Sequence, residues 1–255
     1  MKGLAVVTGA SGGLGLEFAK LLAADGYDLV LVARSADKLE TNAANLREQY
    51  NVGVETIAKD LAVLGAAEEI FLRVPQCDVL VNNAGFASNG RFDTLAEERI
   101  REELLLDVVT LTELTRKYLP LMRARGSGRI LNVASTAAFV PGPFMAVYYA
   151  AKAYVLSFSE AIAEEVRGSG VTVTCLCPGG TATGFQDRAG VRRTLLVRLG
   201  LANAAAVAQA GIDAMMRGKA VVVPGIVNKL IAISPKVSPR RLLIAVSRRL
   251  AEVPQ

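Results

Sequence analysis

The chain is 255 residues long and 52% hydrophobic, which suits one large α/β domain or two small ones. It contains no histidine, and its three cysteines, Cys77, Cys175 and Cys177, show no disulfide pattern. We therefore expect no metal site and interpret the cysteines as reduced core residues. Residues 226–255 carry the whole net charge of +5, so the remainder is neutral and lacks the basic surface that suits nucleic acid.

The sequence shows no targeting signal and no membrane span. The apolar residues Leu4–Val7, which follow the first three residues, are too few for the core of a signal peptide. No apolar run reaches the ~18 residues typical of a membrane-spanning helix. A cytoplasmic location is the expectation.

Short apolar runs alternate with helical patterns along most of the chain. The predicted strands are Leu4–Thr8, Asp28–Ala33, Gly53–Lys59, Asp78–Asn82, Gly128–Ala134, Val171–Cys177 and Ala220–Val223. The predicted helices are Leu14–Asp25, Ala36–Tyr50, Ala62–Val74, Glu97–Arg125 (broken in its middle), Tyr148–Gly168 and Ala202–Arg217. Because the strands lack polar alternation, we expect a Rossmann-like α/β fold with a doubly wound parallel sheet of about seven strands in three α/β/α layers. Residues 1–225 would form this single domain, and 226–255 a basic, amphipathic helical extension at the C-terminus.

The first predicted strand ends in a glycine-rich turn, Thr8-Gly9-Ala10-Ser11-Gly12-Gly13-Leu14-Gly15, which leads into the first helix. Glycine lets a backbone turn tightly and lets a pyrophosphate approach the N-terminus of a helix. The turn therefore indicates a dinucleotide site, and the alternative is a tight strand-to-helix connection without a ligand.

Three polar residues follow the fifth strand. Ser135 comes directly after it, and Tyr148 and Lys152 lie four residues apart on one face of the next helix. Tyrosine has a pKa near ~10 and is a poor acid–base group at neutral pH unless a cation lowers that value. A serine hydroxyl donates and accepts, so Ser135 can hold a substrate oxygen in line with the phenol. Tyr149, three residues before Lys152, is the alternative to Tyr148.

Five motifs occur in a fixed order: the glycine turn, Asn82-Asn83-Ala84-Gly85 after the fourth strand, Ser135, Tyr148-x-x-x-Lys152, and Pro178-Gly179 after the sixth strand. In this order they resemble the short-chain dehydrogenase/reductase family, in its single-domain branch, from Leu4 to about Val223. The resemblance implies a dinucleotide-binding catalytic domain that reduces a carbonyl group with a hydride. It makes Tyr148 the acid–base residue and lets Ser135 polarise the carbonyl. Lys152 would hold the nicotinamide ribose and lower the pKa of Tyr148.

By the same resemblance, cofactor contacts come from the ends of several strands. They are Thr8, Gly9, Ser11, Gly12, Gly13, Leu14, Gly15, Arg34, Ser35, Asp60, Leu61, Asn83, Ala84, Gly85, Tyr148, Lys152, Pro178, Gly179, Thr181 and Thr183. The second strand ends in Arg34-Ser35, without the carboxylate that binds the ribose of NAD. Arg34 can pair with a 2′-phosphate, so NADP(H) is the expected cofactor. For Asp60, an adenine contact and a helix N-cap are both open.

Asp107 departs from the family pattern, which has an asparagine at this place in the helix before the fifth strand. If ionised, Asp107 would favour the cationic form of Lys152 and oppose a phenolate at Tyr148. We count it among the catalytic candidates, and the alternative is a solvated side chain with no role.

The substrate should be a small carbonyl compound, interconverted with its alcohol: an apolar ketone or aldehyde, or a 3-oxoacyl or steroid-type compound. Its contacts are expected from Phe86, Ala87, Thr136–Phe144 and Gly180–Leu201, the last acting as a lid. An apolar pocket of Phe139, Val140, Pro141, Phe144 and Phe185 is one interpretation, and core packing of these residues is the other. Arg188, Arg192, Arg193 and Arg198 could attract an anionic substrate or face water. A cofactor-binding regulator or scaffold with little turnover is the alternative function.

The C-terminal extension is basic and amphipathic. Pro239–Val253 places Leu242, Leu243, Val246 and Leu250 on one helical face, with Arg241, Arg248 and Arg249 mostly off it. It could contact an acidic membrane surface peripherally, or cap its own domain or a partner subunit. Because the family is usually dimeric or tetrameric, we expect a homo-oligomer formed through Glu97–Arg125 and Tyr148–Gly168, with a dimer preferred.

Overall fold

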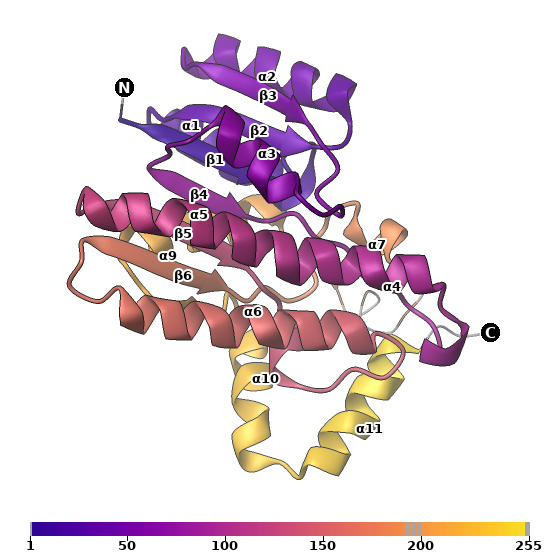
Figure 1. Ribbon diagram of the computed structural model, residues 1–255. Coiled ribbons are helices and arrows are strands. Elements are labelled where there is room, and N and C mark those ends of the chain that lie inside the picture. The colour runs from indigo at the N-terminus through magenta and orange to yellow at the C-terminus, as the bar shows by residue number, and fades with distance from the viewer. Residues whose placement is uncertain (1, 192–193, 195–196, 198–199, 253–255) are drawn as a thin grey trace.

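The computed structural model describes residues 2–191, 194, 197 and 200–252, and these contain one sheet of seven parallel strands. The strands are β1 (Leu4–Thr8), β2 (Asp28–Ala33), β3 (Val54–Ala58), β4 (Val79–Asn82), β5 (Gly128–Val133), β6 (Val171–Leu176) and β7 (Val221–Val222). Their order is β3-β2-β1-β4-β5-β6-β7, so the chain changes direction across the sheet beside β1 (Figure 1). Such a switch point opens a crevice at the carboxyl ends of the strands.

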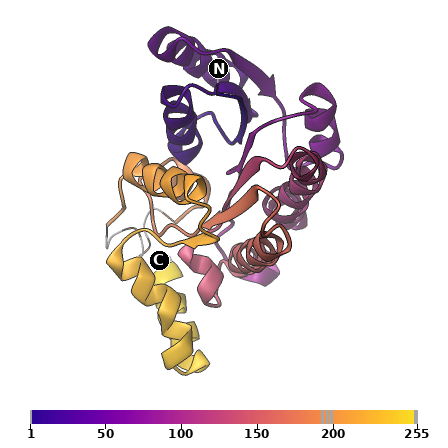
Figure 2. The same ribbon diagram turned by 90° about the vertical axis from the view of Figure 1, so that its left-hand side faces the viewer.

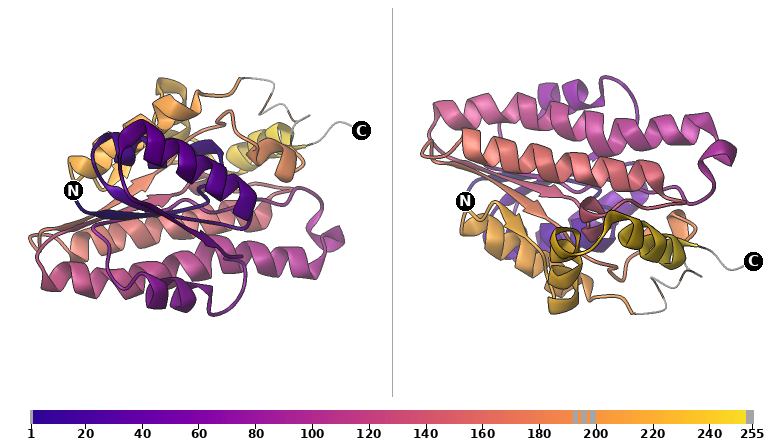
Figure 3. Two further views of the ribbon diagram at one scale, coloured as in Figure 1. Left: turned by 90° about the horizontal axis from the view of Figure 1, so that it is seen from above. Right: turned by 90° about the horizontal axis from the view of Figure 1, so that it is seen from below.

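Helices cover both faces of the sheet, and the predicted three-layer fold is confirmed (Figures 2 and 3). One layer consists of α1 (Gly13–Ala24), α2 (Ala36–Tyr50) and α9 (Ala204–Met216), and the other of α3 (Ala66–Arg73), α5 (Leu111–Ala124) and α6 (Ala146–Glu165). Strand residues alternate between the layers: Val7 and Val81 pack in the first core, and Val6 and Leu80 in the second. Each fully buried side chain of this kind contributes roughly 1.5–3 kcal/mol, so strands buried on both faces stay apolar throughout.

The third helix begins at Ala66 rather than at Ala62, where the sequence predicted it. Asp60 Oδ1 accepts a hydrogen bond from the Ala62 N–H at 2.9 Å, which closes a turn. Gly65, in the left-handed region at φ +80°, then forms the N-cap of α3. The N-cap interpretation of Asp60 is therefore wrong.

The predicted helix Glu97–Arg125 does not break. It consists of α4 (Glu97–Leu104), a π-helical segment η2 (Leu105–Thr110) and α5, and the backbone stays right-handed across both junctions. A π-helical segment widens the turn without ending the helix, and such segments are frequent at functional sites. This one carries Asp107, which is fully buried.

Cys175 and Cys177 lie side by side in the core. Both are free thiols, both are fully buried, and their Sγ atoms are 3.8 Å apart. The interpretation of these cysteines as reduced core residues on one face is confirmed.

After β7, α10 (Ile226–Val237) and α11 (Arg240–Ala251) form a V that projects from the body of the molecule (Figure 1). Its second arm corresponds to the predicted segment Pro239–Val253, of which Val253 lies outside the described residues. The first arm lies within the extension 226–255 that was predicted to be helical, although helix bounds were predicted only for the second arm; Pro235 lies inside this first helix. Within the described ranges, no helix is both long and apolar enough to cross a bilayer.

Candidate active site

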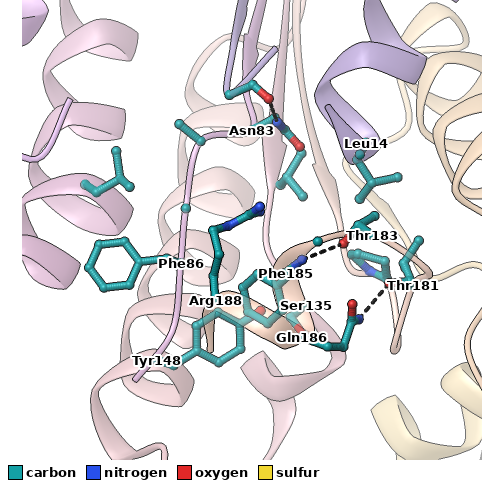
Figure 4. Close-up of a pocket in the computed structure, with 18 of the residues that line it drawn as sticks. Leu14, Asn83, Phe86, Ser135, Tyr148, Thr181, Thr183, Phe185, Gln186 and Arg188 are labelled. Carbon is teal, nitrogen blue, oxygen red and sulfur yellow. Dashed lines mark hydrogen bonds between the residues drawn. The ribbon is translucent and has the colours of Figure 1, made fainter. Parts of the chain in front are cut away.

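A pocket of about 550 Å³ opens at the carboxyl ends of the strands, a volume typical of small-molecule sites (Figure 4). Most predicted site residues line it: Gly9, Ser11, Gly12, Gly13, Leu14, Arg34, Ser35, Asp60, Leu61, Asn83, Ala84, Gly85, Ser135, Tyr148, Lys152, Pro178, Gly179, Thr181 and Thr183. Thr8, Gly15 and Asp107 are not lining residues. They lie behind the wall and hold it in place.

The glycine turn is shaped by close backbone approaches. Gly9 has φ +70°, a conformation that other residues rarely adopt. A Cβ atom on Gly15 would lie 2.3 Å from the carbonyl oxygen of Gly9, so no larger residue fits there. A Cβ atom on Gly12, in contrast, would meet nothing within 4 Å, which leaves space in front of the first turn of α1.

Thr8 joins the ends of β1 and β4 beneath this turn. Its hydroxyl accepts the N–H groups of Asn83 at 2.9 Å and Ala84 at 3.0 Å, and donates to the Val81 carbonyl at 3.2 Å. The Asn83 side chain in turn donates to the Thr8 carbonyl at 2.9 Å. Thr8 therefore positions the wall of the pocket and does not face it.

A second layer of polar contacts lies deeper in the sheet. Asn82 Nδ2 donates to Asn132 Oδ1 at 2.9 Å, and Asn132 Nδ2 donates to Ser159 Oγ at 3.0 Å. These two hydrogen bonds link β4, β5 and α6 behind the pocket.

Basic side chains gather at the end of the pocket next to β2 and β3. Arg34, Lys38 and Lys59 line it, and Arg34 Nη1 lies 3.9 Å from Asp60 Oδ2. Lys59 is held by Glu69 at 2.6 Å. Arg34 was expected from the sequence, whereas Lys38, in the first turn of α2, and Lys59, after β3, were not.

Ser135, Tyr148 and Lys152 meet at the other end of the pocket. Ser135 precedes the short helix η3 (Thr136–Phe139), and its Oγ accepts the N–H of Ala137 at 3.1 Å. Lys152 Nζ lies 5.6 Å from the centroid of the Tyr148 ring, and Phe185 packs on the same ring at 5.5 Å (Figure 4). The three predicted catalytic side chains are thus brought together by β5 and α6.

Burial decides the acidity of both tyrosines. It raises the pKa of Tyr148 above its ordinary value by more than Lys152 and Ser135 lower it. The expectation of a net lowering took account of the ammonium group but not of this burial. The pKa of Tyr149 is raised to about 12 by burial and by the neighbouring Tyr148, with no opposing effect of Lys152. Lys152 therefore acts on Tyr148 and not on its rival.

Asp107 forms a buried ion pair with Lys152. The Nζ–Oδ1 distance is 2.6 Å, Lys152 also donates to the Val133 carbonyl at 3.1 Å, and Asp107 Oδ2 accepts the Phe86 N–H at 3.2 Å. Burial alone would lower the pKa of Lys152, but Asp107 and Tyr148 raise it overall, so Lys152 is held as a cation. The interpretation of Asp107 as a solvated side chain is wrong.

Glu103 is a buried acid that sequence analysis did not single out. It is fully buried, and among the described residues neither of its carboxylate oxygens has a hydrogen-bond partner. Burial raises its pKa to about 7; the nearby Ser88 acts against this and Asp107 adds to it. The sequence could have pointed to Glu103 only through its position four residues before Asp107, which places both acids on one face of the helix.

The apolar end of the pocket differs from the predicted one. Phe86, Met145, Tyr149, Phe185 and Val191 line it. The expected residues Ala87, Phe139, Val140, Pro141 and Phe144 do not, and Phe139 and Val140 pack against hydrophobic clusters instead. The expected ranges did supply Phe86, Thr136 and Ala137, and also Phe185, Val191 and Leu201, to the lining. Which side chains of a loop face a pocket cannot be inferred from its composition. In the 180–201 segment, Arg188 lines the pocket, and Arg192, Arg193 and Arg198 lie outside the described residues.

The sheet order, the glycine turn and the pocket at the strand ends define a Rossmann-like protein with a dinucleotide-type site. Residues 3–193 match the short chain dehydrogenase family, and the chain belongs to this family. It is 35% identical over 185 residues to "Very-long-chain 3-oxoacyl-CoA reductase" of Rattus norvegicus, a match that covers 70% of this chain and 59% of that protein. The match therefore spans less than two thirds of that relative's length.

Solved structures extend the similarity over almost the whole chain. A short-chain dehydrogenase from Sphingobium yanoikuyae in complex with NADPH is 30% identical, with a TM-score of 0.84, and covers 99% of this chain and 98% of its own. The bulky-bulky ketone specific alcohol dehydrogenase from Comamonas testosteroni is 27% identical, with a TM-score of 0.78, and covers 88% of this chain and 86% of its own.

Proposed function

We propose that the protein is an NADPH-dependent reductase of apolar ketones or aldehydes. The observation that carries this proposal is the meeting of Ser135, Tyr148 and Lys152 at one end of a pocket whose other end is the glycine turn and a basic cluster. A dinucleotide spans such a crevice from strand end to strand end. The family membership of the chain supports the same reaction class.

Residues of the glycine turn and of β2 would hold the cofactor. The space in front of Gly12 suits a pyrophosphate at the N-terminus of α1. Arg34, Ser35 and Lys38 provide donors just after β2, and Arg34-Ser35 takes the place of the carboxylate that would select a ribose 2′-hydroxyl; the nearest acid lining the pocket there, Asp60, follows β3. NADPH is therefore favoured over NADH, and the NADPH complex of the Sphingobium yanoikuyae relative supports this preference.

When bound, NADPH supplies the hydride. Tyr148 donates its phenolic proton to the carbonyl oxygen, and the Ser135 hydroxyl holds that oxygen by a hydrogen bond. The Lys152 cation, kept charged by Asp107, stabilises the phenolate that remains on Tyr148. Burial, with a smaller contribution from Asp107, raises the pKa of Tyr148 and keeps its phenol protonated, as a proton donor to the carbonyl oxygen must be.

The substrate end of the pocket suits an apolar carbonyl compound. Its wall contains Phe86, Met145, Phe185 and Val191, and these leave the polar groups concentrated at Ser135 and Tyr148. The names of the similar proteins, a 3-oxoacyl-CoA reductase and a bulky ketone dehydrogenase, point to substrates of the same kind.

The test is the substitution Tyr148→Phe, with Tyr149→Phe as the matched control. NADPH consumption with a panel of apolar ketones should fall at least about 100-fold in the first variant, because the general acid is lost. The control should keep most of its activity. NADPH binding, followed by nicotinamide fluorescence, should survive in both. Full turnover by Tyr148→Phe would refute the assignment, and NADPH binding without turnover of any carbonyl by the unmodified chain would favour the regulator or scaffold.

A further inference from the structure

The C-terminal helix pair, defined as α10 and α11, is attached to the body at few points. No residue of α10 is buried, and in α11 only Ser247 and Ala251 are. Ser247 Oγ donates to the Pro141 carbonyl at 2.5 Å, and the Ala251 carbonyl accepts from Asn89 Nδ2 at 3.0 Å. Figures 1 and 2 show the turn between the two helices pointing away from the sheet. The helix pair therefore contacts the body through the last turns of α11 and through the side of α10 that carries Asn228, which lies against Gly179.

One face of α10 is an exposed apolar stripe. Ile226, Leu230, Ile233 and Val237 recur at the spacing of a single helical face and are 51–79% exposed. Helices of this length are marginal in water unless such a face is buried. In α11, Leu242 and Val246 are at least half exposed as well. The C-terminal helix pair thus presents apolar surface that the body of the chain does not cover.

Basic residues border this apolar surface. Lys229 and Lys236 flank the stripe of α10, and Arg240 and Arg241 follow at the turn, next to Val237 and Leu242. Arg248 and Arg249 lie in the last turns of α11, and Glu252 is the single acid among the described residues after Gly225. The whole net charge of the protein is concentrated here.

We propose that the C-terminal helix pair docks on the surface of an anionic lipid bilayer, with its apolar side chains in the interface and its basic side chains at the lipid headgroups. Amphipathic helices bordered by lysine and arginine bind such surfaces through both contributions. A second copy of the chain is a poorer partner for this apolar surface. A twofold contact between two C-terminal helix pairs would bring two sets of six basic residues together, and like charges repel.

Docking would bring the substrate end of the pocket close to the bilayer. Asn228 of α10 lies against Gly179, and Ala251 of α11 packs in the cluster that contains Met145 and Tyr148. A carbonyl compound dissolved in lipid would then have a short path to Tyr148. This consequence rests on the proposed function, whereas docking itself does not.

The experiment is sedimentation of the purified full chain with vesicles of phosphatidylcholine, with and without phosphatidylserine. The chain should bind the phosphatidylserine vesicles and dissociate at high salt, because surface charges are then screened. The triple variants L230S/I233S/V237S and K236E/R240E/R241E should each lose at least about tenfold in vesicle affinity. The control L64S/L72S removes side chains that are 77% and 71% exposed near α3, and should bind like the unmodified chain.

Two results would overturn the proposal. One is the absence of binding to phosphatidylserine vesicles, or binding that neither triple variant weakens. The other is a change from a larger to a smaller oligomer in L230S/I233S/V237S, without any lipid binding by the unmodified chain, which would make the stripe an interface between copies. Reduction of a water-soluble ketone without vesicles tests the proposed function separately, and all three variants should retain it.

Discussion

Under the proposed function, Arg34 is the residue expected to determine the choice of cofactor most directly. It lies with Ser35 and Lys38 at the end of β2, and its contact with Asp60 is long, at 3.9 Å. A hydrogen bond to a charged group contributes about 1.5–3 kcal/mol, so Arg34→Ala should weaken NADPH binding at least about tenfold. NADH binding should change little, because NADH lacks the 2′-phosphate. Fluorescence titration measures both, and equal losses for the two cofactors would contradict the role.

Glu103 should make the stability of the fold depend on pH. Its pKa is raised to about 7 in the folded protein, against about 4.3 for an ordinary glutamate. Between these values the folded state keeps a proton that the unfolded state has lost, so the protein loses stability as pH rises toward 7. Glu103→Gln, which cannot ionise, should gain roughly 3–4 kcal/mol over the unmodified chain at pH 8 and nothing below pH 4.5.

Urea unfolding at several pH values measures this difference. The groups that act on Glu103 are Ser88, Asp107 and Arg99, and none of them is changed by the substitution. Glu102→Gln is the matched control. Glu102 lies on the same helix and also has Arg99 as a neighbour, at 3.9 Å, but its side chain is exposed. A parallel pH dependence in the unmodified chain and in Glu103→Gln would show that Glu103 ionises normally.

At the scale of elements, the junction of β1 and α1 depends on one close approach. A Cβ atom on Gly15 would lie 2.3 Å from the Gly9 carbonyl, whereas one on Gly12 would meet nothing within 4 Å. Overpacking of this kind costs about 1–3 kcal/mol, so Gly15→Ala should lower the free energy of unfolding by that amount. Gly12→Ala, whose backbone is extended, should stay within about 0.5 kcal/mol in the same urea experiment. Similar losses in both variants would argue against the close approach.

The helix from α4 through η2 to α5 shows what a sequence pattern leaves undecided about an element. Its length and apolar spacing predicted a helix over Glu97–Arg125, and the structure has helix from Glu97 to Ala124. Nothing in the composition of Leu105–Thr110 distinguishes the π-helical segment from the helix on either side, and in the structure this segment packs beside α6. Its consequence, the burial of Asp107 against Lys152, could not be inferred from spacing.

At the scale of the whole molecule, we expect the chain to assemble through α5 and α6. Leu121 and Tyr154 on these helices are exposed, and Tyr154 stacks on Phe158 at 5.7 Å and shares a 3.0 Å hydrogen bond with Thr112. Light scattering should give the mass of a dimer or tetramer. Tyr154→Arg should shift it toward the monomer, because the charge would be buried in a twofold contact. An unchanged mass would place the interface elsewhere.

Local sequence patterns were sufficient to predict the sheet and the residues that lie at the pocket where its strands end. The strands are apolar because both of their faces are covered, and the glycine turn, Asn83, Ser135, Tyr148 and Lys152 each follow a strand or begin a helix at a regular spacing. These positions depend on neighbours within a few residues, so the order of the chain alone was enough to assign them.

Contacts between segments that are distant in the sequence decided the electrostatics of the site and the exposure of the C-terminal helices. Burial of Tyr148 reverses the net direction of its expected pKa shift. The expected influence of Asp107 on Lys152 proves to be a direct, buried ion pair between residues 45 positions apart in the chain. Glu103 is unpaired only because α4 faces the interior there, and the stripe of α10 is exposed only because the body leaves it uncovered. Desolvation and pairing depend on which atoms surround a group in space, and a one-dimensional pattern does not contain that information.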